Sequence, residues 1–336
     1  MRTGESLSAR PPGRTVRERL RRRPAAVLAA AASLAACLTA PSASAAAAAV
    51  CTDRNGWIPS GTIGQGVPHV TDTALLRLAD VDGDADDDLL LLDEIGGIRA
   101  WRNNGTDMPG GGGWAYMGRI ALGAGYPPAR VRFADLDRDG DDDYLVIKDD
   151  GAIDGYVNNG GDLTGTGGIT PGWTPVGQVA QGTGVAADQI HFADLDGDGD
   201  DDYLTLQYTG PVQGWRNDGG DGPGGGGWSP WGKVREGVPL PADFGRQEIH
   251  DVNCDGRDDY LLLSDDSSLY AYENQGETPG AETRFGWSTL TLYAHGTGDA
   301  IDRIMFGELN GDGRVDYIVM APNGSLVGYL NNGGDQ

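Results

Sequence analysis

Residues 192–204 read FADLDGDGDDDYL, and close variants of this string recur along the chain. The other four copies are LADVDGDADDDLL from Leu78, FADLDRDGDDDYL from Phe133, IHDVNCDGRDDYL from Ile249 and FGELNGDGRVDYI from Phe306. Their first acidic residues follow one another at steps of 55, 59, 57 and 57 residues. A string that returns at such an even period predicts a repeat architecture, in which each copy belongs to one structural unit.

Each repeat has the pattern of four short strands. It opens at a tryptophan, as in WTPVGQVA from Trp173, and continues through a brief strand that ends in the acidic string. The third strand, such as YLLLS from Tyr260, is almost entirely apolar, which indicates a strand covered on both faces. The fourth follows a tight turn such as Asn323-Gly324 and ends at an aromatic residue, with an asparagine two positions later.

Four strands in each of five units predict an all-β fold, a β-propeller with five four-stranded blades of about 57 residues. We expect residues 46–56 to form a lead-in and residues 57–336 to form the propeller, with the first blade packing on the fifth to close the ring. An open arc, or a ring completed by a second chain, is the alternative. The expected blades are 57–113, 114–172, 173–227, 228–286 and 287–336.

The acidic string has the spacing of a cation-binding loop. In the third copy, carboxylates occupy positions 1, 3, 5 and 9 of a loop that begins at Asp194. This alternation lets short side chains converge on one point, and Gly199 at position 6 allows the chain to reverse. The carbonyl group of position 7 adds an oxygen, as in the first half of an EF-hand loop. Such an all-oxygen set suits Ca²⁺, so we expect up to five structural calcium ions.

The predicted metal ligands are the residues at positions 1, 3, 5 and 9 of each loop. They are Asp80, Asp82, Asp84, Asp88, Asp135, Asp137, Asp139, Asp143, Asp194, Asp196, Asp198, Asp202, Asp251, Asn253, Asp255, Asp259, Glu308, Asn310, Asp312 and Asp316. The second and third loops have the full set, and we expect them to bind most tightly. Ala85 replaces the glycine of the first loop, where a Cβ strains a positive φ. Asn253 removes a charge from the fourth loop, and Glu308 lengthens the first ligand of the fifth, which we expect to bind most weakly.

The charge of the chain agrees with bound cations. Asp and Glu number 50 against 25 Lys and Arg, a net charge of −25, and residues 1–45 contain eight Arg and two Glu. Without that segment the net charge is 17 − 48, or −31, and five Ca²⁺ would reduce it to −21. Solvated acidic turns are the alternative for the loops, since Asp and Gly favour turns, but five equivalent copies favour metal. Nucleic acid is excluded as a partner because it needs a basic surface.

Residues 1–45 have the pattern of a secretory signal. Eight arginines precede a short, alanine-rich apolar run over residues 25–40, and Ala43-Ser44-Ala45 has the small residues of a cleavage site. The sequence therefore predicts a secreted, extracellular protein, cleaved near Ala45 and without a transmembrane segment after cleavage. The alternative is a lipoprotein anchored through Cys37, because residues 34–37 fit a lipobox. Export also permits a disulfide between Cys51 and Cys254, which the sequence leaves open.

The repeated string resembles a known family. FADLDGDGDDDYL with the trailing GWRNDGGD resembles the FG-GAP/VCBS repeats of integrin-type, calcium-binding propellers, and the versions with NNGGD and GW are similar to repeats of secreted actinobacterial proteins. The resemblance spans about residues 57–336 and implies a β-propeller with Ca²⁺ held at the loop positions named above. Ala85, Asn253 and Glu308 depart from the loop pattern of the family, and each departure affects the predicted calcium site of its own loop. The family includes adhesion modules, lectins and domains appended to hydrolases, so the resemblance leaves the ligand open.

The expected function is a non-catalytic binding or adhesion module, with carbohydrate or a cell-surface protein as its ligand. The recurring aromatics could stack on sugars, or could instead pack between blades: Trp101, Tyr156, Trp215, Tyr272 and Tyr329. The recurring asparagines could hydrogen-bond sugar hydroxyls: Asn103, Asn158, Asn217, Asn274 and Asn331. Tyr116, Tyr126, Tyr208 and Trp231 are less periodic and are the better surface candidates.

Catalysis is the alternative to binding. The sequence contains no nucleophile-elbow or zinc-protease motif, and its histidines, His69, His191, His250 and His295, show no metal-ligand spacing. We expect His191 and His250 to pack beside the strands that enter the loops. We therefore expect no enzyme activity, and the alternative is an extracellular hydrolase or lyase with its active site in the propeller channel.

Overall fold

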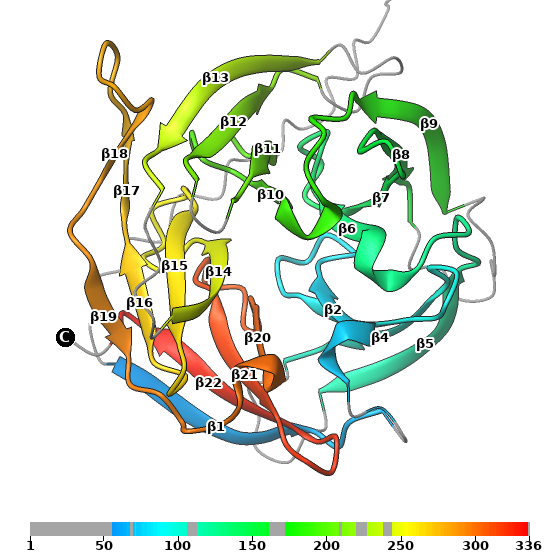
Figure 1. Ribbon diagram of the computed structural model, residues 1–336. Coiled ribbons are helices and arrows are strands. Elements are labelled where there is room, and N and C mark those ends of the chain that lie inside the picture. Colours follow the sequence, from blue (N-terminus) through cyan, green and yellow to red (C-terminus); the bar gives the residue numbers. More distant parts are fainter. Residues whose placement is uncertain are drawn as a thin grey trace, which may run out of the picture. The chain divides into compact units, whose positions relative to one another are not determined.

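The structure is a computed structural model, and it describes residues 56–67, 70, 72–105, 113–160, 172–207, 210–219, 227–237 and 244–334. Within these ranges five four-stranded antiparallel sheets stand around a central axis (Figure 1). The predicted all-β fold, a five-bladed β-propeller, is confirmed. None of the helices among the described residues is long and apolar enough to cross a bilayer.

The strands of the first three blades follow one another along the chain, from the innermost to the outermost. The first blade contains β2 (Leu76–Ala79), β3 (Asp88–Leu92), β4 (Ile98–Asn103) and β5 (Trp114–Ala121). The second contains β6 (Val131–Ala134), β7 (Asp143–Ile147), β8 (Ile153–Asn158) and β9 (Trp173–Ala180). The third contains β10 (Ile190–Ala193), β11 (Asp202–Thr205), β12 (Val212–Asn217) and β13 (Trp228–Arg235).

The last two blades modify this order. The fourth contains β14 (Phe244–His250), β15 (Asp259–Ser264), β16 (Leu269–Tyr272) and β19 (Thr291–Ala294). Between its third and outermost strands lies an extra hairpin of β17 (Asn274–Glu277) and β18 (Phe285–Trp287), so the strand expected from Trp287 begins later. The fifth contains β20 (Ile304–Gly307), β21 (Asp316–Met320), β22 (Leu326–Asn332) and the N-terminal β1 (Gly56–Gly64).

The blades are offset by one strand from the predicted repeat units, so the predicted blade boundaries are wrong. The strand that opens at a tryptophan is the outermost strand of the preceding blade, because Trp114 lies opposite Asn103 and Trp173 lies opposite Asn158. The strand that ends at the recurring asparagine and the strand that begins at the next tryptophan are thus the two arms of one antiparallel hairpin. The glycine-rich links connect strands within a blade and do not connect blades.

The chain closes the ring by itself. β1 pairs with β22, from Trp57 opposite Asn331 to Gly64 opposite Leu326, so both ends of the propeller sequence share one sheet. We predicted that the first blade would pack on the fifth as a separate unit. Instead the first strand of that unit completes the fifth blade, and neither an open arc nor a second chain is needed.

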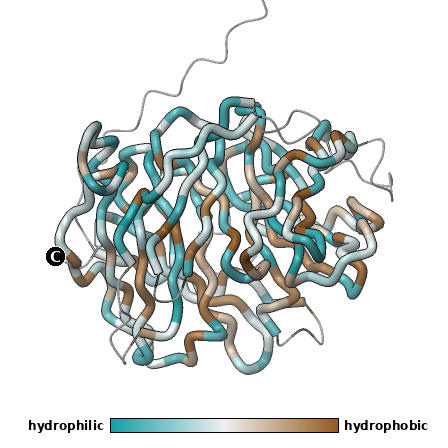
Figure 2. Tube along the Cα trace, turned by 45° about the horizontal axis from the view of Figure 1, so that its top comes forward, coloured by the Kyte–Doolittle hydropathy of each residue, from teal (hydrophilic) through white to brown (hydrophobic). Residues whose placement is uncertain are grey.

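The middle strands form the core, as their apolar runs predicted. β7 is buried at all five positions, and Leu145 and Leu204 in β7 and β11 are fully buried. Figure 2 shows hydrophobic residues along the strands and hydrophilic residues in many of the connections. The middle strands are buried on both faces because neighbouring blades pack face to face, and this packing fixes the positions of the inner strands around the axis.

The inner strands give the ring two different ends. Four of them follow a short 3₁₀ turn directly: η1 (Thr73–Leu75), η2 (Pro128–Arg130), η3 (Ala187–Gln189) and η4 (Ile301–Arg303). At its other end each inner strand runs into its acidic string. We call these ends of the ring the turn end and the loop end.

Candidate metal loops and central cavity

The structure brings predicted ligands together in the first three loops. Oxygen atoms lie within 4.8 Å of one another in three groups: Asp80 with Asp82 and Asp84, Asp135 with Asp137 and Asp139, and Asp194 with Asp196 and Asp202. The third group contains the residue at position 9, whereas the first two contain positions 1, 3 and 5. Among the described residues, the fourth and fifth loops form no such group.

The first acid of each loop shapes the turn. In the third loop, Asp194 accepts hydrogen bonds from the backbone N–H groups of Gly197 at 2.8 Å and Gly199 at 2.8 Å. Gly199 has a φ of 92°, and Ala85 at the same position of the first loop has a φ of 73°. The predicted strain at Ala85 is therefore confirmed, because a residue with a Cβ occupies the left-handed region there.

The ninth acid anchors the loop to its own blade. Asp202 is fully buried and accepts the N–H groups of Leu195 at 3.0 Å and Asn217 at 2.9 Å on its two oxygens. Burial raises its pKa to about 9. The corresponding Asp316 makes the same two bonds in the fifth loop. Position 9 is thus a structural anchor as well as a predicted ligand.

Position 7 separates the loops into two classes, and the sequence interpretation missed its side chain. The first three loops have Asp86, Asp141 and Asp200 there, and we call them the acidic loops. The fourth and fifth have Arg257 and Arg314, and we call them the arginine loops. Arg257 Nη2 lies 2.6 Å from Asp255 Oδ2, and the buried Arg314 lies 3.9 Å from Asp312.

The acidic loops contain carboxylate oxygens that are buried and lack any hydrogen-bond partner. They are Asp86 Oδ1, Asp88 Oδ2, Asp141 Oδ1, Asp196 Oδ1, Asp198 Oδ1 and Asp200 Oδ1. Burial, with the neighbouring Asp139, raises the pKa of Asp141 to about 8. Buried oxygens without donors are costly unless a cation binds them, so the donor set fits a hard divalent ion. In the third loop, Arg138 of the second loop supplies part of the balancing positive charge, because its Nε lies 2.8 Å from Asp200 Oδ2.

Position 8 clasps each blade to the preceding one, a second role that the sequence interpretation missed. Asp142 donates its N–H to Asp80 O at 2.6 Å and accepts Asp80 N–H on its carboxylate at 2.9 Å. The same pair of bonds recurs between Asp201 and Asp135, Asp258 and Asp194, and Asp87 and Glu308. Val315 keeps only the backbone bond, to Asp251 O. The acidic triplet at positions 7 to 9 was the available signal in the sequence.

The recurring asparagines join blades and do not face solvent. Asn158 is 1% exposed and donates its side-chain N–H to Val81 O of the preceding loop at 3.1 Å. The asparagines Asn103, Asn217, Asn274 and Asn331 make the equivalent bond. The predicted sugar contacts by these asparagines are therefore wrong, because their side chains are buried and bonded to loop carbonyls of the preceding blade.

The recurring aromatic residues also pack inside the ring. Tyr156 lies edge-on to Tyr144 with ring centroids 5.5 Å apart, and Trp215 lies 5.2 Å from Tyr203. Tyr272 and Tyr329 likewise contact the buried Tyr260 and Tyr317, whereas Trp101 contacts the exposed Tyr116 of the outermost strand. The tryptophan that opens each unit donates its indole N–H to a neighbouring blade, as Trp173 does to Ile120 O at 3.0 Å.

The less periodic candidates differ from one another. Tyr116 is 61% exposed, whereas Tyr126 and Trp231 pack against core clusters. Tyr208 and His69 lie outside the described residues, as do the predicted signal and Cys51. Cys254 is disulfide-bonded, and the other two cysteines of the chain, Cys37 and Cys51, both lie outside those residues.

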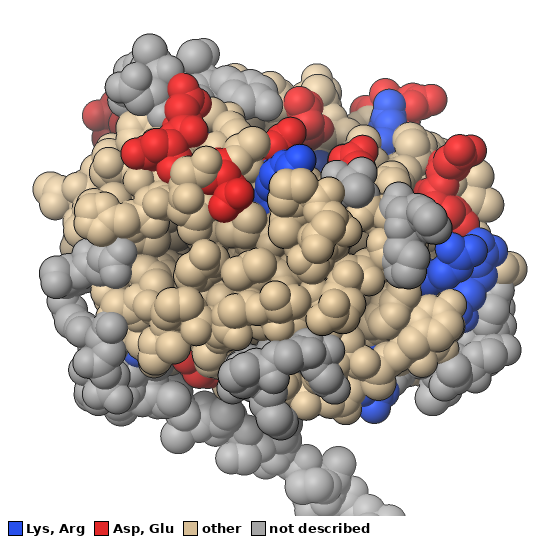
Figure 3. All heavy atoms as spheres, turned by 90° about the horizontal axis from the view of Figure 1, so that it is seen from below, with Lys and Arg blue, Asp and Glu red and all other residues tan. Residues whose placement is uncertain are grey.

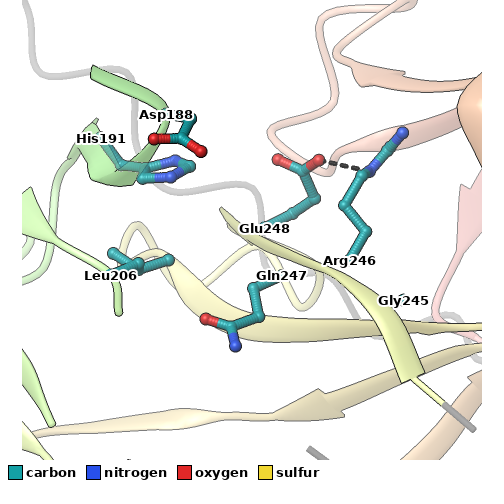
Figure 4. A pocket seen from close by; sticks show the side chains of 7 residues that line it. All are labelled: Asp188, His191, Leu206, Gly245, Arg246, Gln247 and Glu248. Carbon is teal, nitrogen blue, oxygen red and sulfur yellow. Dashed lines mark ion pairs between the residues drawn. The ribbon is translucent and has the colours of Figure 1, made fainter. Parts of the chain in front are cut away.

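A central cavity opens at the turn end. Its volume is about 1070 Å³, and it is lined by the inner strands of all five blades. His191 and His250 line it, so they do more than pack beside the loops. A smaller pocket of about 190 Å³ lies between β10 and β14, where Glu248 pairs with Arg246 at 2.6 Å across from His191 and Asp188 (Figure 4).

A closed ring of repeated blades, with an acidic loop after each inner strand, defines a repeat β-propeller. The FG-GAP-like repeat model matches residues 80–146, 135–205 and 251–319, which is more than half of the sequence. The chain belongs to the FG-GAP-like repeat family. No curated protein matches it significantly.

Several solved structures have a related fold at low identity. An Agrocybe aegerita lectin, described as recognising non-reducing terminal N-acetylglucosamine, is 19% identical with a TM-score of 0.44, over 83% of this chain and 73% of the lectin. The Photorhabdus luminescens Tc holotoxin pore is 18% identical with a TM-score of 0.43, over 80% of this chain and 12% of the toxin. BBS1N in complex with ARL6DN is 10% identical with a TM-score of 0.41, over 82% of this chain and 97% of the matched chain.

Proposed function

We propose that this protein is a calcium-stabilised β-propeller that acts as a non-catalytic binding module. The observation that carries the calcium assignment is the set of buried carboxylate oxygens without hydrogen-bond partners in the acidic loops. Residues at positions 1, 3, 5 and 9 would hold the ion, and its charge would offset the repulsion among them. Because the position 8 clasps tie each loop to the next blade, an ion in one loop would stabilise two blades.

The test is thermal unfolding of the purified chain with excess chelator, with millimolar Ca²⁺ and with millimolar Mg²⁺. A ligand at a hundredfold excess over its dissociation constant stabilises a protein by about 2.7 kcal/mol per site. Three occupied acidic loops would contribute roughly 8 kcal/mol, so we expect the melting temperature to fall by more than about 10 °C in chelator. Mg²⁺ should restore little of this, because it retains its waters. Identical melting curves in chelator and in Ca²⁺ would overturn the assignment.

We also propose that the module acts outside the cell. The signal-like pattern of residues 1–45 supports this, and so does the disulfide at Cys254, because structural disulfides persist in oxidising compartments. The candidate ligands are carbohydrate and a cell-surface protein. A glycan array and a pull-down from cell-wall material, each with and without chelator, distinguish the two. Turnover of a substrate panel by the purified chain would contradict the non-catalytic assignment.

A further inference from the structure

The central cavity contains one position that is equivalent in all five blades and is occupied by four different residue types. It is the residue three places before the first loop acid, and the register of every inner strand places it opposite the middle of the neighbouring strand. The five residues are Arg77, Arg132, His191, Glu248 and Met305, and all of them line the cavity. The blades are thus most alike in their loops and least alike at the cavity wall.

Arg77 and Arg132 are held in place by backbone carbonyl groups. Arg77 donates to Leu76 O at 2.6 Å, to Ala74 O at 3.1 Å and, in the next blade, to Pro128 O at 2.8 Å. Arg132 likewise makes two bonds within its own blade and two to the next, including one to Ile190 O at 3.0 Å. A guanidinium has five N–H groups, so each arginine keeps at least one for another partner.

These two arginines carry charge that no carboxylate neutralises directly. Neither has an ion-pair partner among the described residues. Burial, with the nearby Arg77, lowers the pKa of Arg132 to about 10, against smaller opposing effects of Glu248 and Asp188. Burial lowers the pKa of Arg77 as well, against a smaller opposing effect of Glu248. Two like charges fixed close together away from bulk water favour a bound anion.

The remaining charges of the cavity lie in two layers. Among the inner-strand side chains, Arg77, Arg132 and Arg246 face one carboxylate, Glu248, which is already paired with Arg246. The other charges of the lining are Asp72, Asp188 and Asp302, which are exposed at the 3₁₀ turns of the rim, and Arg303, which lies in η4. Figure 4 shows the Glu248 carboxylate turned toward Arg246, with His191 and Asp188 on the facing element. On the side wall of the ring, acidic side chains gather mainly along one edge (Figure 3).

The cavity also has an apolar wall. Leu78, Phe133 and Phe306 line it, and the ring of His250 lies 5.9 Å from that of Phe306. The volume of about 1070 Å³ is larger than an inorganic ion needs and suits a compact organic body. A fixed pair of guanidinium groups beside an apolar wall is the arrangement that recognises a carboxylate attached to such a body.

We propose that the central cavity binds a small organic carboxylate, such as a sugar acid, with its carboxylate on Arg77 and Arg132. This inference rests on the proposed function as a binding module and names the ligand class and its site. The ligand enters from the turn end, opposite the calcium loops. The exposed rim carboxylates are screened by salt, whereas the inner arginines are screened much less.

The test is calorimetric titration of the calcium-saturated chain with two matched pairs of probes: glucuronate against glucose, and benzoate against benzyl alcohol. We expect at least one carboxylate to bind with an affinity at least tenfold above its neutral counterpart. Equal affinities within both pairs, or no binding by either carboxylate, would overturn the proposal. Melting of the same sample with and without Ca²⁺ shows separately whether the calcium assignment holds.

Three variants locate the site. Arg132→Gln should weaken the carboxylate at least tenfold, and Glu248→Gln should strengthen it severalfold by removing the opposing charge, a gain that misfolding does not produce. Arg130→Gln is the matched control, because Arg130 also bonds backbone carbonyls at the turn end, at 2.7 Å to Lys148 O, but does not line the cavity. A loss with Arg130→Gln equal to that of Arg132→Gln, or an unchanged affinity in Glu248→Gln, would place the anion elsewhere and refute the assignment.

Discussion

The acidic loops and the arginine loops have one backbone design and two ways of balancing charge. Both classes bend around a first acid, reverse at position 6 with a positive φ and anchor a buried acid at position 9. In the acidic loops position 7 adds another carboxylate, and buried oxygens lack partners. In the arginine loops the same position brings a guanidinium to the carboxylate of position 5. The comparison teaches that the loop is a structural element of every blade, and that position 7 determines how much it depends on an external cation.

The largest expected effect tests the part that both classes share. Asp202→Ala and Asp316→Ala each leave two buried N–H groups without an acceptor, at a cost of about 1–3 kcal/mol per group. We expect both variants to lose roughly 4 kcal/mol of unfolding free energy in chelator, measured by denaturant titration. In Ca²⁺, Asp202→Ala should lose more than Asp316→Ala, because Asp202 lies with Asp194 and Asp196 in one ligand group. A much larger loss for one variant in chelator would show that the shared anchor is not equivalent in the two classes.

The next effect separates the classes and has opposite signs in two conditions. Asp141→Asn removes one charge from an acidic loop in which Asp141 lies close to Asp139 and has an oxygen without a partner. In chelator at pH 9, above the pKa of about 8 at which Asp141 becomes charged, we expect the melting temperature to rise by about 2–4 °C, or roughly 1 kcal/mol, because repulsion decreases. In Ca²⁺ we expect it to fall, because the loop attracts the ion less.

The counterpart in an arginine loop is Arg257→Gln, which frees the carboxylate of Asp255. We expect it to raise the affinity of the fourth loop for Ca²⁺ severalfold in calorimetric titration. Asp149→Asn, in an exposed turn, is the control for general charge effects and should change neither quantity. A change of the same sign for Asp141→Asn in both conditions would contradict the charge-balance explanation of the two classes.

Much of this architecture could be predicted from the sequence, because the repeats carry local signals. The apolar third strand, the Asn323-Gly324 turn and the acidic string each specify their own backbone. The blade offset could not be predicted in this way, because it depends on whether the strand that begins at Trp114 pairs with the preceding or the following strand. The period of the repeat is the same in both cases. Closure through β1 follows from the same choice.

At the loops, the sequence located acidic residues that the structure brings together in three of the five loops, and it missed what packing adds. The clasp of Asp142 onto Asp80 joins residues 62 positions apart, and the acidic triplet at positions 7 to 9 marks Asp142 without identifying its partner. The cavity residues were missed because Arg77, Arg132, His191, Glu248 and Met305 share a place in space but do not share one residue type. Their equivalence becomes visible only when the strand register is known.

The smallest expected effect concerns the one acidic loop that departs from glycine at position 6. Ala85 has a φ of 73°, whereas Gly140 and Gly199 have 89° and 92° at the same position. A left-handed residue with a Cβ costs about 1–2 kcal/mol, and the greater freedom of glycine in the unfolded chain offsets part of this. We therefore expect Ala85→Gly to stabilise the protein by about 0.5–1 kcal/mol in chelator, measured as a rise in melting temperature. Ala115→Gly, in the exposed part of β5, should be destabilising, so a matching response of the two variants would show that strain at position 6 does not limit the first loop.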